Sequence, residues 1–349
     1  MRQGTFWFSG IFLLVIIYFL SAPAFAHVPV FGGEGKSLET AILIEDPSKS
    51  RVLYGELASG NLRYYSFKME KGERIVLGLT IPVEQGNQGF APNLILIGPG
   101  LADEGKVPEK LEVPEGYGTK VLSYSLPEST VYEGFTPSAF YSLAHLDIKA
   151  PESGMYYAAV GAIQEKGLQE REIQKEGNYG LILGYRETFT LKEWISIPLS
   201  QIKIYLWEGQ SFLLIFTPLA LTLAAGLLAI FLKREAVAGF SPARISGAIA
   251  GLFFLGTGAT CVFQMLISLS KSSYSSGIVI TLFLILASIG LGVVAIALSL
   301  KDESYGTGST RKRLYFSGLG IAGLLLWAGW FIGPLLAFEA SVLPWKHKG

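Results

Sequence analysis

Two histidines carry the clearest potential for chemistry in this sequence. Cleavage after Ala26 would make His27 the first residue of the mature chain. Its free amine and its Nδ1 atom could then chelate a metal ion, and His145 is the second histidine that could complete a three-nitrogen site. Nitrogen ligands of this kind favour copper among the divalent first-row metals. The hypothesis of a metal site at His27 and His145 follows from these residue types, and no spacing signature supports it.

Recognised catalytic patterns are absent from the sequence. It contains no Gly-x-Ser-x-Gly, His-Glu-x-x-His or Cys-x-x-Cys motif and no phosphate-binding loop. His145 and Asp147 would face the same side of an expected strand, but no nucleophile accompanies them. We therefore expect a binding protein rather than an enzyme, and we predict no cofactor.

The N-terminus has the three parts of a secretory signal peptide. Arg2 lies in a short basic start, an apolar run covers 6–20, and Ala24-Phe25-Ala26 supplies the small residues that a signal peptidase needs. An uncleaved anchor helix is the alternative, because the apolar run approaches the roughly 20 residues that span a membrane. We predict that 1–26 is a signal peptide and that the segment after it is exported.

The charged residues are unevenly distributed, although 28 Lys and Arg balance 28 Asp and Glu. Acidic residues prevail from 34 to 193, whereas the rest of the chain consists of long apolar runs separated by short basic loops. We do not expect nucleic acid as a partner of either part. The single cysteine, Cys261, lies in an apolar run, so the exported domain must be held together by its own core.

Four apolar runs are long enough to span a membrane as helices. They cover 212–232, 245–269, 277–300 and 314–338. The first and third connecting loops are rich in Lys and Arg, whereas the second carries only Lys271. The positive-inside rule places the two basic loops in the cytoplasm. We therefore predict a multi-pass plasma-membrane protein, in which 211–340 is an all-α four-helix bundle and both 27–210 and the short tail 341–349 are extracytoplasmic.

A transport function would require polar or ionisable groups that face a cavity among these helices. Gln264 is the polar residue at depth, and Glu339 lies near a rim. Transport is therefore disfavoured, and a water-accessible Gln264 would be the structural sign in its favour.

The segment 27–187 has the pattern of short β-strands. Runs such as RVLYGEL, RIVLGLTIPV and NYGLILGY are separated by Gly, Pro and Asn turns. This pattern predicts an antiparallel β-sandwich. The segment 188–210 is expected to be an amphipathic juxtamembrane segment, with Thr190 and Glu193 as the capping box of a helix.

The order of several motifs resembles the bacterial pre-peptidase C-terminal (PPC) type of domain. These motifs are RYYSF at 63–67, the Lys-Gly-Glu turn at 71–73, NLIL at 93–96 and PESGMYYAAV at 151–160. The resemblance implies a jelly-roll-like sandwich with a binding or accessory role. The sequence departs from the PPC pattern at Leu62-Arg63, where an Asp is usual, and by a long insertion at about 101–146.

The insertion at 101–146 is rich in Tyr, Phe, Pro and Ser, a composition typical of adaptable contact surfaces. Its aromatic residues could instead cap an open end of the sandwich. We predict a non-enzymatic, membrane-anchored surface protein whose sandwich binds another membrane or cell-surface protein, or a glycan. The alternative is an extracytoplasmic copper-binding or redox accessory protein that uses His27.

Overall fold

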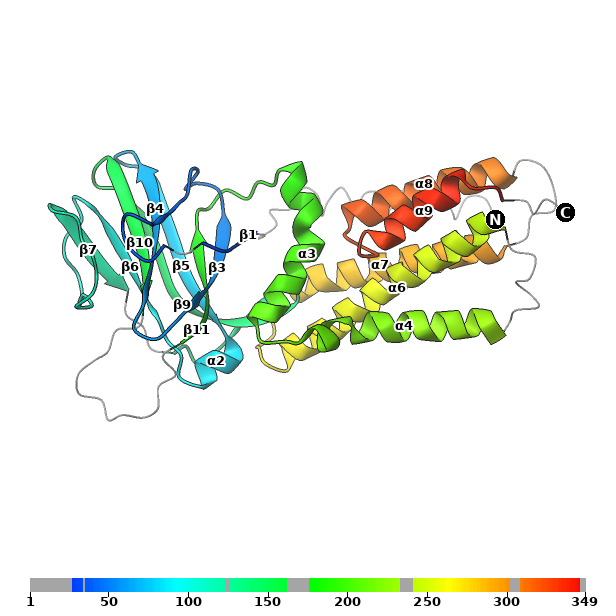
Figure 1. Cartoon of the computed structure of the whole chain (residues 1–349), viewed down its shortest axis with the longest axis horizontal. Coiled ribbons are helices and arrows are strands. Elements are labelled where there is room, and N and C mark those ends of the chain that lie inside the picture. The colour runs from blue at the N-terminus through cyan, green and yellow to red at the C-terminus, as the bar shows by residue number, and fades with distance from the viewer. Residues whose placement is uncertain are drawn as a thin grey trace.

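The chain forms a β-rich part and a helical part that lie end to end along its long axis (Figure 1). The computed structural model describes residues 27–33, 35–122, 126–161, 176–232, 241–301 and 308–345. The predicted signal peptide at 1–26 lies outside the described residues. The predicted order, a β-rich domain followed by apolar helices, is confirmed.

Two sheets form the β-rich part. Sheet A has six strands, in the order β1 (Val28–Phe31), β3 (Arg51–Leu57), β11 (Gly177–Leu183), β5 (Arg74–Pro82), β9 (Ser138–Lys149) and β8 (Val131–Glu133). Sheet B has five, in the order β2 (Ile42–Leu43), β4 (Leu62–Met69), β10 (Gly154–Gly161), β6 (Asn93–Pro99) and β7 (Tyr117–Leu122). A short helix, α2 (Val83–Asn87), follows β5.

The strand pairs are antiparallel except at the first strand of each sheet. β1 runs parallel to β3, and β2 runs parallel to β4. Between β1 and β3 the chain contributes β2 to sheet B. It then returns to sheet A as β3, which runs in the same direction as β1. The prediction of a wholly antiparallel sandwich is corrected at these two edge strands.

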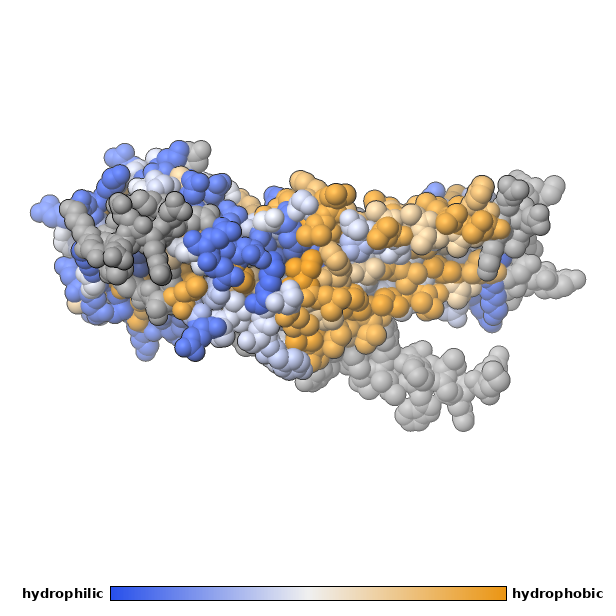
Figure 2. Space-filling model, turned by 90° about the horizontal axis from the view of Figure 1, so that it is seen from below, coloured by the Kyte–Doolittle hydropathy of each residue, from blue (hydrophilic) through white to orange (hydrophobic). Residues whose placement is uncertain are grey.

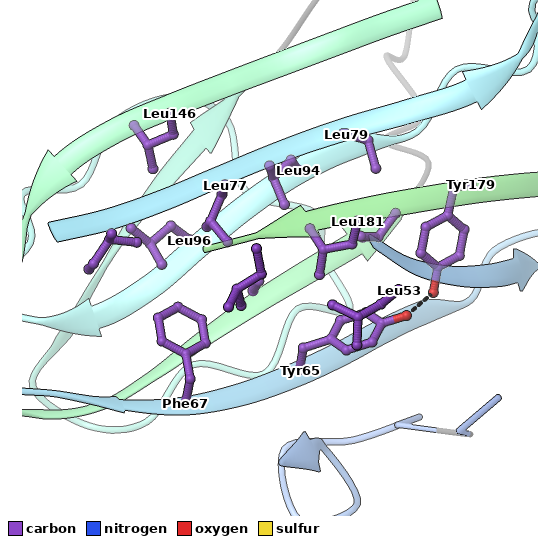
Figure 3. Close-up of a cluster of buried hydrophobic side chains, with 14 of the residues drawn as sticks. Leu53, Tyr65, Phe67, Leu77, Leu79, Leu94, Leu96, Leu146, Tyr179 and Leu181 are labelled. Atoms are coloured by element: carbon purple, nitrogen blue, oxygen red, sulfur yellow. Dashed lines mark hydrogen bonds between the residues drawn. The ribbon is translucent and has the colours of Figure 1, made fainter. Parts of the chain in front are cut away.

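The main hydrophobic core lies between the two sheets (Figure 3). Tyr65 and Phe67 are buried from β4, as their alternation in the sequence predicts, and Leu77 and Leu79 are buried from β5. The hydroxyl groups of Tyr65 and Tyr179 form a hydrogen bond of 2.7 Å inside this core. The bond satisfies two polar atoms that would be costly to bury alone.

A second apolar layer covers the outer face of sheet B. Strand β6 is buried at all but its last residue. It therefore lacks the alternation of buried and exposed side chains that is typical of a strand with one solvent-exposed face. Ile95 and Ile97 belong to this outer layer, where Leu111 from the loop after β6 packs against them. The Glu112 amide donates a hydrogen bond to the Tyr64 hydroxyl at 3.0 Å. The loop 101–116 is therefore part of the packing of the sandwich.

The segment 101–146, predicted to be an insertion, contributes strands to both sheets. It contains β7, which forms an edge of sheet B, and β8 and most of β9 in sheet A. β9 pairs with β5 from Lys149 opposite Arg74 to Phe140 opposite Pro82. A bulge in this pairing breaks the alternation of β9, so the sequence indicates a strand around His145 and Asp147 but not its full length. Deleting 101–146 would therefore dismantle the sandwich rather than remove a surface loop.

In the described part of the chain, three helices are long and apolar enough to cross a membrane. They are α4 (Phe212–Leu232), α6 (Pro242–Leu269) and α7 (Ile278–Leu300), in agreement with the first three predicted spans. Gly251 of α6 lies so close to α7 that a Cβ atom on it would be 2.9 Å from the Gly292 carbonyl oxygen. These small residues allow close helix packing within the chain. Figure 2 shows a hydrophobic surface over the helical part and a mainly hydrophilic one over the sandwich, as a bilayer requires.

The fourth predicted span consists of two helices joined by a tight turn. α8 (Gly308–Leu325) is followed by α9 (Ile332–Val342), which runs back beside it (Figure 1). Trp327 and Phe331 have positive φ angles, which residues other than glycine rarely adopt, and Gly329 lies between them. Hydropathy does not distinguish one long helix from two short antiparallel ones. The prediction of a simple four-helix bundle is corrected to three long helices and this α8–α9 hairpin.

The α8–α9 hairpin also changes the expected location of the C-terminal segment. The Trp345 ring packs 5.2 Å from the Phe316 ring, and the Lys312 Nζ atom lies 5.0 Å from the centre of the Trp345 ring. Lys312 also donates a hydrogen bond of 2.6 Å to the Lys301 carbonyl oxygen, at the end of α7 remote from the sandwich. The prediction that the tail lies on the same side as the sandwich is therefore contradicted as far as Trp345. Residues 346–349 lie outside the described residues.

Gln264, the polar residue expected at depth, is fully buried and paired with Gln210. The two side-chain amides exchange two hydrogen bonds of 2.9 Å, one in each direction. Gln264 therefore does not line a water-filled path, which is the sign that a transport function would need. The pair instead ties α6 to the residue that precedes α4.

Replacing either glutamine of this pair by leucine should destabilise the protein, and replacing both should cost less than the sum of the two. A single substitution leaves the hydrogen bonds of the remaining buried amide to its partner unmade, at a cost of about 2 kcal/mol, whereas the double substitution replaces the pair by an apolar contact. Gln210→Leu also removes the hydrogen bond of 3.1 Å from Gln210 Nε2 to Glu208 Oε2, but this loss is common to the single and the double variant and cancels in the cycle. A double-mutant cycle of Gln210→Leu and Gln264→Leu on thermal unfolding of the full chain in detergent measures the coupling. Additive effects would contradict this account.

Candidate functional site

Helix α3 (Leu191–Trp207) lies between the sandwich and the helical part, across the long axis of the molecule (Figure 1). The predicted capping box holds its N-terminus: Thr190 Oγ1 accepts a hydrogen bond from the Glu193 amide, and Glu193 Oε2 accepts one from the Thr190 amide. At the other end, Trp207 Nε1 donates to the Tyr179 carbonyl oxygen at 3.1 Å. α3 is therefore fixed by its cap at one end and tied to β11 at the other.

Strand β8 and the turn after it hold the sandwich against the helices. The Tyr132 hydroxyl and Thr281 Oγ1 of α7 are 2.8 Å apart, and Thr281 Oγ1 donates to the Gly134 carbonyl oxygen at 2.6 Å. The turn of the α8–α9 hairpin adds a contact to α3, because Trp327 Nε1 donates to the Trp194 carbonyl oxygen at 3.1 Å. Sandwich, α3 and hairpin are thus joined by direct hydrogen bonds.

A cavity of about 100 Å³ lies where sheet A, α3 and the hairpin turn meet. We call it the junction cavity. Its walls are mainly apolar, and six aromatic residues line it: Tyr54, Phe135, Phe140, Phe189, Trp207 and Trp327. Polar side chains also line it: His27, Thr80, Glu133, Thr136, Ser138, Ser200 and Gln201. Such a combination of aromatic walls with polar groups is typical of ligand-binding sites.

Glu133, the last residue of β8, is the acidic residue of the junction cavity. Its Oε1 atom accepts a hydrogen bond from the Phe135 amide at 3.0 Å. No lysine, arginine or histidine of the described ranges forms an ion pair with it. Burial raises the pKa of the Glu133 carboxyl to about 7. Near neutral pH the cavity can therefore present either a neutral carboxyl group or a negative charge.

His27 lines the same cavity from the residue before β1. Its Nδ1 atom lies 2.5 Å from Ser50 Oγ, and burial lowers the pKa of the imidazole. Ser50 is only 1% exposed, so this histidine–serine pair offers no accessible nucleophile. A copper chelate through the amine and Nδ1 of His27 would have to displace the Ser50 hydroxyl.

His145 lies far from His27. It is exposed on β9, and β3, β11 and β5 separate that strand from β1 in sheet A. Neighbouring strands are about 4.8 Å apart, so the two histidines are about 19 Å apart across the sheet. Asp147, expected beside His145, forms a salt bridge of 2.7 Å with Arg74. The described residues contain no group of three or more His, Cys, Asp or Glu that could hold a metal ion. The structure does not bring the two predicted ligands together, and a site at the His27 amine stays a prediction.

The segment 101–146, predicted as a contact surface, contributes Glu133, Phe135 and Phe140 to the cavity, but sequence reasoning singled out neither Glu133 nor the rings from the other segments. A signal was present in the run VYEGF at 131–135, which places one acidic residue among aromatic ones. The junction cavity, however, is built from segments near residues 27, 54, 135, 189, 207 and 327. These segments come together only because α3 and the hairpin turn pack on sheet A, and no local sequence pattern predicts that packing.

No family model matches the sequence, and no curated protein matches it. Among solved structures, the chain is similar to the crystal structure of Salmonella Typhimurium PliG, a periplasmic lysozyme inhibitor of g-type lysozyme, at 19% identity and a TM-score of 0.23. The match covers 42% of this chain and 100% of that one. A mutant of PliG from Escherichia coli gives 20% identity and a TM-score of 0.21, with 46% and 100% covered.

A third similar structure is that of CorA, a surface-associated copper-binding protein important in copper acquisition by Methylomicrobium album BG8. The identity is 13% and the TM-score 0.20, with 46% of this chain and 99% of that chain covered. Likeness at this level carries no argument about function, so the function of this chain is inferred from its own geometry.

Proposed function

We propose that this chain is a non-enzymatic surface protein, anchored in the plasma membrane by its apolar helices, with a PPC-like sandwich on the extracytoplasmic side. The distribution of charge supports this orientation. Arg244 and Lys312 donate hydrogen bonds to carbonyl oxygens at the end of α7 remote from the sandwich. Lys301 follows α7 directly, and Arg313 follows Lys312. The positive-inside rule assigns that end to the cytoplasm.

The sandwich binds another membrane or cell-surface protein, or a glycan, at the junction cavity. The cavity is the observation that supports this proposal, because the other faces of the two sheets are covered by parts of the chain itself. The inner faces of both sheets form the main core, and the loop 101–116 helps to cover the outer face of sheet B. The outer face of sheet A, beside α3, is where aromatic and polar side chains surround a hollow.

Filling the junction cavity tests this function. Ser200 lines the cavity from α3, so Ser200→Trp would occupy the hollow. We expect native mass spectrometry of the full chain, purified in detergent from the membranes of cells that naturally make it, to show a bound mass that Ser200→Trp loses. Ser196→Trp is the matched control, because Ser196 lies one turn away on α3, does not line the cavity, and should leave the bound mass unchanged.

Two results would contradict the proposed function. One is a wild-type chain that carries no bound mass, and the other is a bound mass that Ser200→Trp retains. The thermal unfolding temperatures of both tryptophan variants show whether each is folded, and a loss of ligand that accompanies unfolding would not count in favour of the proposal.

A further inference from the structure

We propose that the junction cavity binds a small organic cation of the methylated ammonium class, with the aromatic rings around it and the Glu133 carboxylate against its charge. This inference rests on the proposed function and adds to it the chemical class of the ligand. It is argued in three steps, from the rings, the charges and the size of the cavity.

The aromatic rings meet at steep angles around the hollow. The Tyr54 and Trp207 rings lie 5.1 Å apart at 74°, and the Phe135 and Trp327 rings lie 6.4 Å apart at 72°. In each of these pairs the edge of one ring packs on the face of the other, and Tyr54 also stacks on Phe31 at 4.9 Å. The hollow meets the ring surfaces that these contacts leave open, and the face of each ring is electronegative. Aromatic cages of this kind recognise quaternary ammonium groups through cation–π attraction. The rings therefore favour a cation over an anion.

The charges of the junction cavity point the same way. Glu133 faces it without an ion-pair partner in the described ranges, and Glu187 adds negative charge nearby, because it raises the pKa of Glu133. The other titratable side chains of the cavity are neutral at pH 7, because burial lowers the pKa of His27 and raises that of Tyr54. A buried carboxylate is normally paired with a positive charge. No described side chain supplies that charge, so a cationic ligand can supply it. Because a His27 amine freed by cleavage after Ala26 would compete with the ligand, the binding test uses a chain whose N-terminus has been determined by mass spectrometry.

The size of the cavity limits the ligand to a few heavy atoms. A volume of about 100 Å³ is smaller than the roughly 150 Å³ of an apolar cavity that holds benzene. A trimethylammonium head group fits this limit, whereas a whole sugar ring is too large to be enclosed in it. The head group can belong to a free small molecule or to a larger partner whose remainder stays outside.

Choline and 3,3-dimethylbutan-1-ol are matched probes for this inference, because they have the same shape and differ in charge. We expect saturable binding of choline to the full chain in a maltoside detergent, about tenfold tighter than that of the neutral alcohol. Titration calorimetry measures both affinities. The fluorescence of Trp207 and Trp327 reports occupation of the cavity, since both rings line it.

Glu133→Gln should abolish the preference for choline over the alcohol. Glu208→Gln is the matched control. Glu208 is a second buried carboxyl at the junction, but it bonds to the Ala139 amide at 2.9 Å and does not line the cavity, so this variant should keep the preference. A preference that survives Glu133→Gln in a folded protein would overturn the inference.

Equal binding of the two probes to the wild-type chain, or no binding of choline, would also overturn it, and that comparison does not depend on how any variant folds. This test can be distinguished from the test of the proposed function. If Ser200→Trp loses a bound mass while the wild type binds choline no more tightly than the alcohol, the proposed ligand class is wrong and the proposed function stands.

Nanodiscs identify the source of the head group. The two nanodiscs contain the same fraction of phosphatidylglycerol, so that their surface charge is equal, with phosphatidylcholine or phosphatidylethanolamine as the remaining lipid. Weaker choline binding in the phosphatidylcholine nanodiscs indicates that a lipid head group competes, and equal binding indicates a free ligand.

Discussion

Gly134→Ala is expected to release the sandwich from the membrane helices. A Cβ atom on Gly134 would overlap the carbonyl group of Gly277, and a backbone group cannot turn away as a side chain can. The same shift would strain the hydrogen bond from Thr281 Oγ1 to the Gly134 carbonyl oxygen. Overpacking and loss of this bond together should destabilise the contact by about 3 kcal/mol. Amide hydrogen exchange of β8 in the full chain would show the release as a loss of protection.

Gly277→Ala is the matched control for this prediction, because it alters the other side of the same contact. A Cβ atom on Gly277 would meet the nearest atom, the Gly134 amide nitrogen, at 3.4 Å, which is ordinary van der Waals contact. We therefore expect Gly277→Ala to leave the protection of β8 nearly unchanged. Equal effects of the two substitutions would show that the contact does not have the geometry described above.

The second large effect expected is a loss of stability as the pH rises from about 4.5 to 7. Burial raises the pKa values of Glu133 and Glu208 from 4.5 to about 7. Within that window the folded chain keeps protons that the unfolded chain has lost, so the free energy of unfolding falls with rising pH and levels off above 7. The stabilisation is fully present below pH 4.5, and each carboxyl contributes at most about 3 kcal/mol.

Thermal unfolding across this pH range, in the wild type and in a variant with Glu133→Gln and Glu208→Gln, measures the effect. The variant should show a flatter profile, because neither amide titrates. His27 acts in the opposite sense below about pH 6.5, since burial lowers its pKa, but it is present in both proteins and cancels in their difference. A wild type that gains stability relative to the variant as the pH rises would contradict the prediction.

The elements that the sequence predicted well are those whose signal is local and continuous. The run 212–232 coincides with α4 (Phe212–Leu232), because an unbroken apolar stretch flanked by polar residues has one stable arrangement in a bilayer. The capping box of Thr190 and Glu193 is also where it was expected, since a cap depends on residues three apart.

The features that the sequence concealed depend on residues far apart in the chain. The apolar run 314–338 includes a reversal at Trp327 and Phe331, which hydropathy averages away. The full length of β9 was hidden by its irregular alternation, although a strand was expected around His145 and Asp147 and β9 pairs with β5 from end to end. The junction cavity needs the docking of α3 and the hairpin turn on sheet A, so neither Glu133 nor its aromatic neighbours could be assigned from spacing alone.

The α8–α9 hairpin has a consequence for how the membrane part is assembled during synthesis. In the part of the chain after α7 that the structure describes, the turn between α8 and α9, with the sequence LWAGWF at 326–331, is where the chain reaches the sandwich side of the helical part. This stretch contains no charged residue. Moving charge across a hydrocarbon layer is the costly step of insertion, at about 3 kcal/mol for each charged residue at the centre of a helix. Helices α8 and α9 can therefore enter the bilayer together, because the turn that crosses the bilayer between them has no charged residue.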